Sequence, residues 1–437
     1  MSNKTREQVL TEITGIGPED VVWRDPDVWA QLERSPDSYD KQTGERVKEG
    51  KPFATPANAR AVLEGDPAYA GKLAYNEFLG RACYEGKPVE DWLEARIAFR
   101  IELGYRFVMP HRLIASLMVD VARDRPYHPV RIYLQDLEWD RVDRLDTWLS
   151  EFLGVEQTPL NAAIGRRWAI SAVARVLPPG THGASVEGGP GCKVDTVLIL
   201  AGGQGLGKSS ALRILASPAW FSDSMIDTGN KDAYQNIKGK WLYEFAELDS
   251  MQRREATSIK AFLSAQVDTY RSSFGRNPAD HPRQVLFVGT TNEQAFLNDS
   301  TGSRRMWPVD VTRVDLPGLR DARDQLWAEA VARYWGGERW FLNPEEDERR
   351  REQADKHSQS DPWEELVAFY IHGRSEVTVA EILDEAIKMD AEKRHNGHTR
   401  RLGGILSAQG WTKGRRKRIG GKLVRPWLAP VPSVPSA

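Results

Sequence analysis

Cysteines and long apolar runs are scarce in this sequence. The 437 residues include only two cysteines, Cys83 and Cys192, which are too few for a disulfide framework or, on their own, for a zinc site. No run of about eighteen apolar residues is present to cross a membrane. The first ten residues, MSNKTREQVL, lack the apolar centre of a secretion signal. These absences lead us to expect a cytoplasmic protein without a membrane partner.

Net charge is also small, at −2 for the whole chain, but it is unevenly distributed. Residues 393–425 contain eleven Lys and Arg and no Asp or Glu, whereas residues 344–361 are rich in acids. A basic stretch is often only a solvated surface, but this density of cations predicts contacts with nucleic-acid phosphates. Six of the fifteen tryptophans have apolar sequence neighbours and are predicted to lie in the core: Trp139, Trp148, Trp168, Trp241, Trp307 and Trp340.

Residues 194–214 join an apolar strand pattern, a glycine-rich turn and a helix start without interruption. Gly202, Gly207, Lys208 and Ser209 fit the phosphate-loop pattern G-x-x-x-x-G-K-S/T. The glycines bring backbone N–H groups close to phosphate, Lys208 reaches the β- and γ-phosphates, and the Ser209 hydroxyl binds Mg²⁺. A plain glycine-rich turn with a surface lysine is the alternative. The predicted cofactors are ATP and Mg²⁺, and the predicted nucleotide-binding residues are Gly202, Gly203, Gln204, Gly205, Leu206, Gly207, Lys208, Ser209 and Ser210.

Such a site also needs an acidic residue at a neighbouring strand end, to hold Mg²⁺ and orient the attacking water. In KWLYEFAELD, at residues 240–249, we choose Glu247, and Glu244 and Asp249 remain alternatives. A further strand, QVLFVG, is followed by Asn292, a polar amide suited to sensing the γ-phosphate. About a dozen residues later come Arg304 and Arg305. An arginine can stabilise transition-state charge from a neighbouring subunit, although such a pair can also form ordinary salt bridges.

These elements, in order and spacing, resemble the virulence-associated protein E family. The resemblance rests on the phosphate loop, the strand with Glu247, IKAFLSAQVDTYRSSFGR at 259–276, the strand ending in GTTN, and TGSRRMWPV at 301–309. It extends upstream to AYNEF, YHPVRIYLQDLEWD and RRWAISAVARV, and covers about residues 55–342. The family is similar to superfamily 3 helicases of phages and mobile genetic elements. It implies an AAA+-like ATPase core in the cytoplasm of a bacterial host, assembled as a homo-oligomeric ring, usually a hexamer, with ATP between subunits.

The resemblance assigns roles to individual residues. Lys208 and Ser209 match the Walker A motif, Glu247 the Walker B glutamate, and Asn292 the sensor asparagine, while Arg305 matches the arginine finger because it directly precedes Met306 and Trp307. The 259–276 segment implies a DNA-contacting hairpin in the ring channel, with Asp268 at one of its charged positions and with the predicted DNA contacts Lys260, Arg271 and Arg276. The loop at 179–191 is longer than the family pattern. Residues 1–54 are too few for a primase-polymerase domain, so we expect priming to need a separate protein.

The predicted domain organisation follows these patterns. An irregular segment at 1–54 precedes a mainly helical domain at 55–178, and the α/β phosphate-loop ATPase core covers 179–342. A charged linker at 343–361 leads to a small winged-helix-like domain at 362–428 and a disordered tail at 429–437. In the winged-helix-like domain, Thr378 and Glu381 form a capping-box pattern. Its DNA contacts are predicted at Arg415, Arg416, Lys417 and Arg418.

Together these features predict an ATP-dependent DNA helicase or replication-initiation ATPase that moves along single-stranded or forked DNA. One alternative is a DNA-binding assembly factor that nucleotide occupancy switches, without unwinding. A phosphate-loop kinase for a small molecule is a further alternative, but it leaves Asn292, Arg305 and the basic C-terminal domain without a role.

Overall fold

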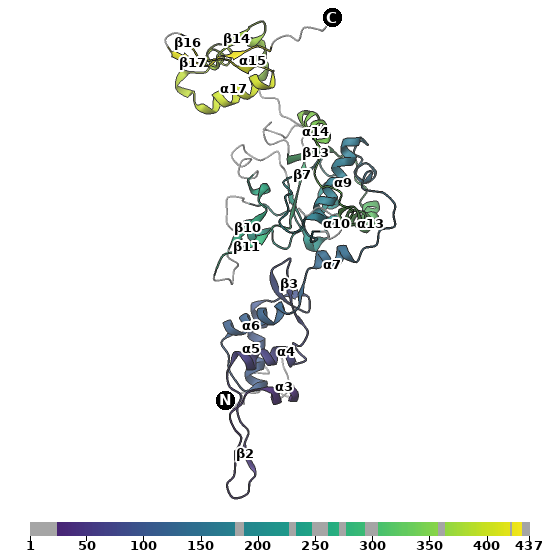
Figure 1. Cartoon of the computed structure of the whole chain (residues 1–437), viewed down its shortest axis with the longest axis vertical. Helices are drawn as coiled ribbons and strands as arrows, with labels where there is room; N and C mark the ends of the chain where they lie inside the picture. Colours follow the sequence, from purple (N-terminus) through teal and green to yellow (C-terminus); the bar gives the residue numbers. More distant parts are fainter. Residues whose placement is uncertain are drawn as a thin grey trace, which may run out of the picture. The chain divides into compact units, whose positions relative to one another are not determined.

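The structure is a computed structural model that describes residues 24–179, 188–226, 233–246, 261–270, 277–292, 305–356, 363–419 and 422–430. The chain forms two compact units, Met1–Lys356 and His357–Ala437, whose elements are labelled in Figure 1. Within the described ranges, no helix has both the length and the apolar character needed to cross a membrane.

The first unit contains a five-stranded parallel sheet, with β7 and β13 labelled in Figure 1. Its strand order is β13-β7-β12-β9-β8. All residues of the three inner strands are buried, which explains why their sequences are nearly continuous apolar runs rather than alternating patterns. This sheet confirms the predicted α/β class. The strands are β7 (Val197–Ala201), β8 (Phe221–Ser222), β9 (Leu242–Phe245), β12 (Leu286–Thr291) and β13 (Met306–Asp310).

Helices before and after the sheet in sequence pack against it and against one another. Helix α9 packs against α13, which in turn contacts α10. Five of the six tryptophans predicted to lie in the core are buried, and Trp139 is half-buried. The helices are α7 (Pro129–Gln135), α8 (Trp148–Leu153), α9 (Pro159–Ala174), α10 (Lys208–Ala216), η1 (Pro218–Trp220), α11 (Ala233–Asn236) and α13 (Leu316–Trp335).

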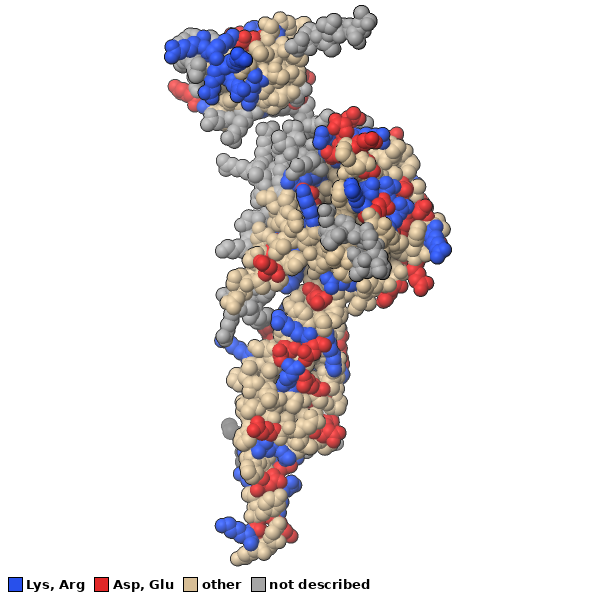
Figure 2. Space-filling model, in the orientation of Figure 1, with Lys and Arg blue, Asp and Glu red and all other residues tan. Residues whose placement is uncertain are grey.

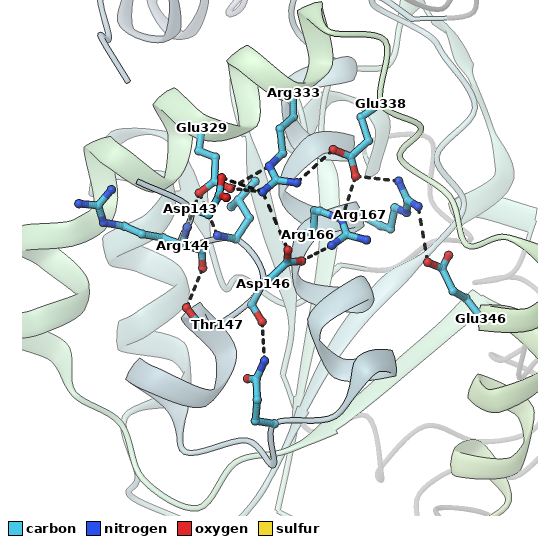
Figure 3. Close-up of polar contacts among 12 residues, drawn as sticks. Asp143, Arg144, Asp146, Thr147, Arg166, Arg167, Glu329, Arg333, Glu338 and Glu346 are labelled. Carbon is cyan, nitrogen blue, oxygen red and sulfur yellow. Dashed lines mark hydrogen bonds and ion pairs between the residues drawn. The ribbon is translucent and has the colours of Figure 1, made fainter. Parts of the chain in front are cut away.

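A charged network fixes α9 and α13 to the chain around them (Figure 3). Glu329 of α13 is fully buried, accepts hydrogen bonds from the backbone N–H groups of Arg144 and Leu145, and pairs with Arg333. On α9, Arg167 pairs with Glu338 at 3.0 Å and extends toward Glu346. Buried acids of this kind are tolerated because their oxygens are hydrogen-bonded.

Residues 344–356, which were predicted to be part of a charged linker, instead form helix α14 (Pro344–Lys356). This helix packs against β13 and α9. Arg350 is fully buried and pairs with Asp347 at 2.8 Å, and the three acids in the first turn complement the positive end of the helix dipole. The charge-rich sequence therefore conceals a packed helix, because its buried cation has an internal partner.

The part preceding the sheet combines helices with short strands around its own apolar cluster. The prediction of a mainly helical region is therefore incomplete, and residues 24–54, predicted to be irregular, include α3 and a two-stranded hairpin. The short strands escaped prediction because two to four residues are too few to show a period. The elements are α3 (Pro26–Gln31), β1 (Ser38–Tyr39), β2 (Arg46–Lys48), α4 (Pro56–Gly65), α5 (Asp91–Tyr105), α6 (His111–Arg123) and a sheet of order β5-β4-β3-β6, with β3 (Leu73–Asn76), β4 (Arg81–Tyr84), β5 (Lys87–Pro88) and β6 (Pro126–Tyr127).

The second unit has its own apolar core, which includes Trp411 and Trp427. Both hydrogen bonds of the predicted capping box, between Thr378 and Glu381, are present. The elements are α15 (Glu364–Ile371), α16 (Val379–Glu381) continued by a π turn (Ile382–Ala386), a 3₁₀ turn (Ala391–Lys393), α17 (Asn396–Ala408), a sheet of order β14-β18-β15 and a β16–β17 hairpin. The strands are β14 (Glu376–Val377), β15 (Thr412–Lys413), β16 (Lys417–Ile419), β17 (Lys422–Val424) and β18 (Trp427–Leu428).

Candidate functional site

The glycine-rich loop lies between the carboxyl end of β7 and the first turn of α10. Gly205 and Gly207 have φ angles of +79° and +92°, a left-handed conformation that favours glycine. Gly207 is the N-cap of α10, so the loop backbone and the positive end of the helix dipole meet at one place. Residues 203–205 are exposed. This arrangement suits an anion such as a phosphate group.

Lys208 is almost completely buried, at 6% exposure, and its amine lies inside the loop. Its Nζ donates to the carbonyl oxygens of Gly202 at 2.6 Å and Gly203 at 2.8 Å, and to Asn292 Oδ1 at 3.1 Å. Burial lowers the pKa of Lys208, and the nearby Glu244 carboxylate opposes that effect. The structure thus brings together the predicted phosphate-binding lysine and the predicted sensor asparagine, because β12 is the neighbour of β7.

Ser209 contacts a buried carboxylate on the strand beyond β12. Glu244 of β9 is 1% exposed, and its Oε1 accepts hydrogen bonds from Ser209 Oγ at 2.7 Å and Thr290 Oγ1 at 2.6 Å. Its Oε2 is buried and has no hydrogen-bond partner within the part of the chain that the structure describes. A buried carboxylate oxygen without a partner is costly and calls for a missing cation or donor.

These oxygens fit a magnesium ion. Mg²⁺ prefers hard oxygen ligands and is commonly held by one or two protein groups together with phosphates and waters. Ser209 Oγ and Glu244 Oε2 would supply such ligands beside the phosphate loop. The described residues contain no cluster of three or more His, Cys, Asp and Glu that could hold a metal without a phosphate partner.

Glu244 is therefore the acidic residue that the described chain places at Ser209. Glu247, the acid chosen from the sequence, and Asp249 lie outside the described residues. Thr290 had no predicted role. The signal for Glu244 was present as the single charged residue of the strand 241–245, where every other residue is apolar or aromatic. The spacing alone could not show which acid would meet Ser209.

Arg305 lies at the other end of the sheet. It directly precedes β13, whose first residue Met306 pairs with Val197 at the start of β7. Its Nε donates to Ser264 Oγ at 3.1 Å and lies 3.5 Å from Asp195 Oδ2. About 16 Å of strand, at ~3.3 Å per residue, separates this edge from the phosphate loop. Arg305 and the loop of the same chain are therefore not brought together.

The chain between β9 and β12 includes a two-stranded antiparallel hairpin of β10 (Val267–Tyr270) and β11 (Ala279–Pro282), separate from the main sheet. Asp268, placed by the family resemblance among the charged positions of the DNA-contacting segment, is buried instead. It forms a two-point ion pair with Arg283, with 2.9 Å between Asp268 Oδ2 and Arg283 Nε. The Asp268 carboxylate is thus held in an ion pair inside the fold. The predicted DNA contacts Lys260, Arg271 and Arg276 lie outside the described residues.

The predicted DNA-contacting cations of the second unit lie in and before β16. Arg415, Arg416, Lys417 and Arg418 are all exposed. Lys417 pairs with Glu376 at 2.5 Å, so part of its charge is compensated locally. Figure 2 shows Lys and Arg side chains gathered on the visible face of this unit. Exposed cations of this kind are suited to contacts with phosphate groups.

Comparison with known proteins gives a family and several distant structural likenesses. The family model of the virulence-associated protein E-like domain matches residues 134–359, which is just over half of the chain. No curated protein sequence matches the chain. One apo structure of the NrS-1 C-terminal region is 12% identical, with a TM-score of 0.39, and covers 68% of this chain and 78% of its own. The A form of that region is 11% identical, with a TM-score of 0.43 and coverages of 82% and 96%. A RuvB mutant from Thermotoga maritima is 12% identical, with a TM-score of 0.20 and coverages of 52% and 84%.

Proposed function

Since the chain belongs to the virulence-associated protein E-like domain family, we propose that it is an ATP-dependent DNA helicase or replication-initiation ATPase of a phage or mobile genetic element. The observation that supports this proposal most strongly is the convergence of four polar side chains at the carboxyl edge of one parallel sheet. Lys208 meets Asn292, and Ser209 meets Glu244. Ligands of parallel α/β sheets bind at this edge.

In the proposed site, the loop 202–210 binds the phosphates of ATP, and Lys208 exchanges its carbonyl partners for phosphate oxygens. Ser209 and Glu244 hold Mg²⁺, which when bound neutralises charge on the β- and γ-phosphates. Thr290 holds the Glu244 carboxylate in place through its 2.6 Å hydrogen bond. Asn292 senses the γ-phosphate, because its side chain already contacts the lysine that binds it. Glu247 remains our proposal for orienting the attacking water.

The position of Arg305 supports a shared site in a ring of identical subunits, which we propose to be a hexamer. Arg305 lies at the amino edge of the sheet, far from its own phosphate loop. It can contribute to hydrolysis only at the site of a neighbouring chain, where an arginine supplied in trans stabilises charge on the γ-phosphate. In the single chain, Asp195 and Ser264 hold it.

We propose that DNA is bound by two parts of the chain. The connection between β10 and β11 contains Arg271 and Arg276, which together with Lys260 would follow single-stranded DNA in the ring channel. The second unit is proposed to be a winged-helix-like module, since the helices α15, α16 and α17 precede the basic β16–β17 hairpin, and β14, β15 and β18 form a short sheet. There Arg415, Arg416, Lys417 and Arg418 would bind phosphates of the duplex or fork.

Strand displacement tests the proposal directly. A forked duplex with one labelled strand is incubated with the full chain, Mg²⁺ and ATP, and Lys208→Ala is the matched control. The helicase proposal predicts release of the labelled strand by the wild type only. Binding of the fork that depends on ATP, without strand release, would reject the helicase and favour the nucleotide-switched assembly factor.

A further inference from the structure

A cavity of about 150 Å³ lies at the base of the β10–β11 hairpin, apart from the phosphate loop. Its walls come from three segments: β3 with the turn after it, the turn after α11, and the hairpin itself. His128, which directly follows β6, the parallel partner of β3, lies 2.6 Å from Gln284 of the third segment. The cavity is large enough for a planar ring system rather than for a whole nucleoside triphosphate.

The hairpin presents one face to this cavity. Successive strand residues point to opposite faces, so Asp268 and Tyr270 share a face, which also carries His281, the residue opposite Asp268. All three line the cavity. The Tyr270 and His281 rings stack with centroids 4.2 Å apart at 27°. The other face, with Thr269 and Asp280, is exposed. The hairpin therefore places a flat aromatic surface in the cavity wall.

Hydrogen-bonding capacity in the wall is left unused. His281 Nε2 is buried and has no hydrogen-bond partner within the described chain. Burial lowers the pKa of His281, with a further contribution from Lys238, so the ring is neutral at pH 7 and offers one donor and one acceptor. Burial also raises the pKa of Tyr270, to about 12, so its hydroxyl keeps its proton. A planar ligand with donors and acceptors at its edge would satisfy these groups.

One positive charge in the wall, that of Lys238, lacks an acidic partner within the described chain and contacts the Tyr270 ring instead. The two acids that line the cavity are both engaged, since Asp268 pairs with Arg283 and Glu77 with Arg131. The Lys238 amine has no ion-pair or hydrogen-bond partner within the ranges described, and lies 5.7 Å from the centre of the Tyr270 ring. Burial lowers the pKa of Lys238, which reflects the cost of holding this charge there. An anionic group would remove that cost.

We propose that this cavity binds one nucleotide unit, with its base against the Tyr270–His281 stack and its phosphate at Lys238. Aromatic stacking is tolerant of base identity because every base has a flat π face. Pockets that accept a single base read it in the same way, by stacking and by hydrogen bonds to its edge. The nucleotide can be part of single-stranded DNA or a free nucleotide. The first case rests on the proposed function, and the second does not.

The test uses the full chain with Lys208→Ala as background, so that the phosphate loop does not bind the probe. Binding of a fluorescein-labelled oligo(dT) is measured by anisotropy, and binding of thymidine monophosphate by calorimetry. Tyr270→Leu and Lys238→Met are compared with Thr269→Val, a control on the exposed face of the same strand. Melting temperatures show whether each variant is folded, and Lys238→Met keeps the test usable if Tyr270→Leu is not.

The proposal predicts that Tyr270→Leu and Lys238→Met each weaken binding of at least one probe about tenfold, while Thr269→Val has no effect. Tyr270→Leu removes the ring on which the base stacks, and Lys238→Met removes the positive charge at the phosphate. Loss confined to the oligonucleotide identifies DNA as the source, and loss confined to the monophosphate identifies a free nucleotide. Wild-type affinity of both folded variants for both probes, or no binding of either probe by the background protein, would overturn the proposal. The monophosphate measurement stays informative if the chain does not unwind DNA.

Discussion

At the scale of single residues, the Glu244 carboxylate determines how the site would hold a cation. One oxygen accepts two hydrogen bonds, from Ser209 and Thr290, and the other is buried without a partner within the described chain. The two hydrogen bonds fix the orientation of the carboxylate, so the unpaired oxygen has one defined position. Removal of a neighbouring group that orients a metal ligand typically weakens metal binding by about 10- to 100-fold.

We therefore predict that Glu244→Gln abolishes Mg²⁺-dependent hydrolysis, because the amide loses the charge that attracts the cation. Thr290→Val should raise the Mg²⁺ concentration needed for half-maximal nucleotide binding by about 10- to 100-fold, and Thr290→Ser should restore it. Steady-state ATP hydrolysis measures the first effect, and binding of a fluorescent ADP analogue across a Mg²⁺ titration measures the second without turnover. Equal Mg²⁺ dependence in Thr290→Val and the wild type would contradict this role.

The choice between Glu244 and Glu247 as the acidic residue at Ser209 could not be made from the sequence. The phosphate loop, the sensor position of Asn292 and the apolar strands were predicted from local patterns, since each depends on residues adjacent in sequence. Which acid faces Ser209 depends on the register of β9 relative to β7, the strand that leads into the phosphate loop. The strand between them, β12, sets this register, because its Val288 lies opposite Leu198 of β7 and Glu244 of β9. The sequence of one strand does not show its register relative to another strand more than forty residues away.

At the scale of elements, the buried His128 is the N-cap of α7 and follows directly after β6. It also contacts Gln284, which lies just after the β10–β11 hairpin. His128 is 3% exposed; its Nδ1 accepts from the backbone N–H of Arg131, and its Nε2 lies 2.6 Å from Gln284 Oε1. Nε2 must therefore carry the proton and donate to Gln284. Burial lowers the pKa of His128 to about 4, from an ordinary value of 6.5.

This burial predicts a dependence of stability on pH. The unfolded chain takes up a proton at His128 near pH 6.5, whereas the folded chain does so only near pH 4. The contribution of neutral His128 is thus fully present above pH 6.5 and is lost as the pH falls toward 4. The variant His128→Asn retains a helix-capping side chain. Urea unfolding between these pH values should show a steeper loss in the wild type than in the variant, and parallel curves would contradict the assignment.

Helix α14 illustrates the same limit for elements. Its sequence is so charged that it was predicted to be a linker, yet Arg350 is fully buried against its partner Asp347. Whether a charged helix packs depends on which distant surface accepts it, here β13 and α9. The region 55–178 was predicted to be mainly helical, and it contains α4, α5, α6, α8 and α9, because each of these helices has its own start signal or apolar face.

At the scale of the whole molecule, Arg305 lies at the amino edge of the sheet and Lys208 at the carboxyl edge of the same sheet. If both act on one ATP, they must come from different chains. A subunit with Arg305→Ala retains its own phosphate loop, and a subunit with Lys208→Ala retains its arginine. A mixture of the two can therefore assemble complete sites.

We predict that an equimolar mixture of Arg305→Ala and Lys208→Ala hydrolyses ATP clearly faster than the mean of the separate proteins, because an arginine supplied in trans contributes about 10³-fold or more. Mixing Arg305→Ala with the double variant Lys208→Ala/Arg305→Ala is the control. The variant Asp195→Asn tests whether loss of the local ion pair alone has an effect. A mixture no faster than the mean would argue for a site contained in one chain.

Steady-state ATP hydrolysis with and without single-stranded DNA tests whether the chain couples nucleotide hydrolysis to DNA. The chain is proposed to couple a nucleotide site at Lys208, Ser209 and Glu244 to DNA held by other elements. We expect Mg²⁺-dependent hydrolysis that single-stranded DNA stimulates and that Lys208→Ala removes. Hydrolysis that DNA leaves unchanged, or that persists in Lys208→Ala, would contradict it.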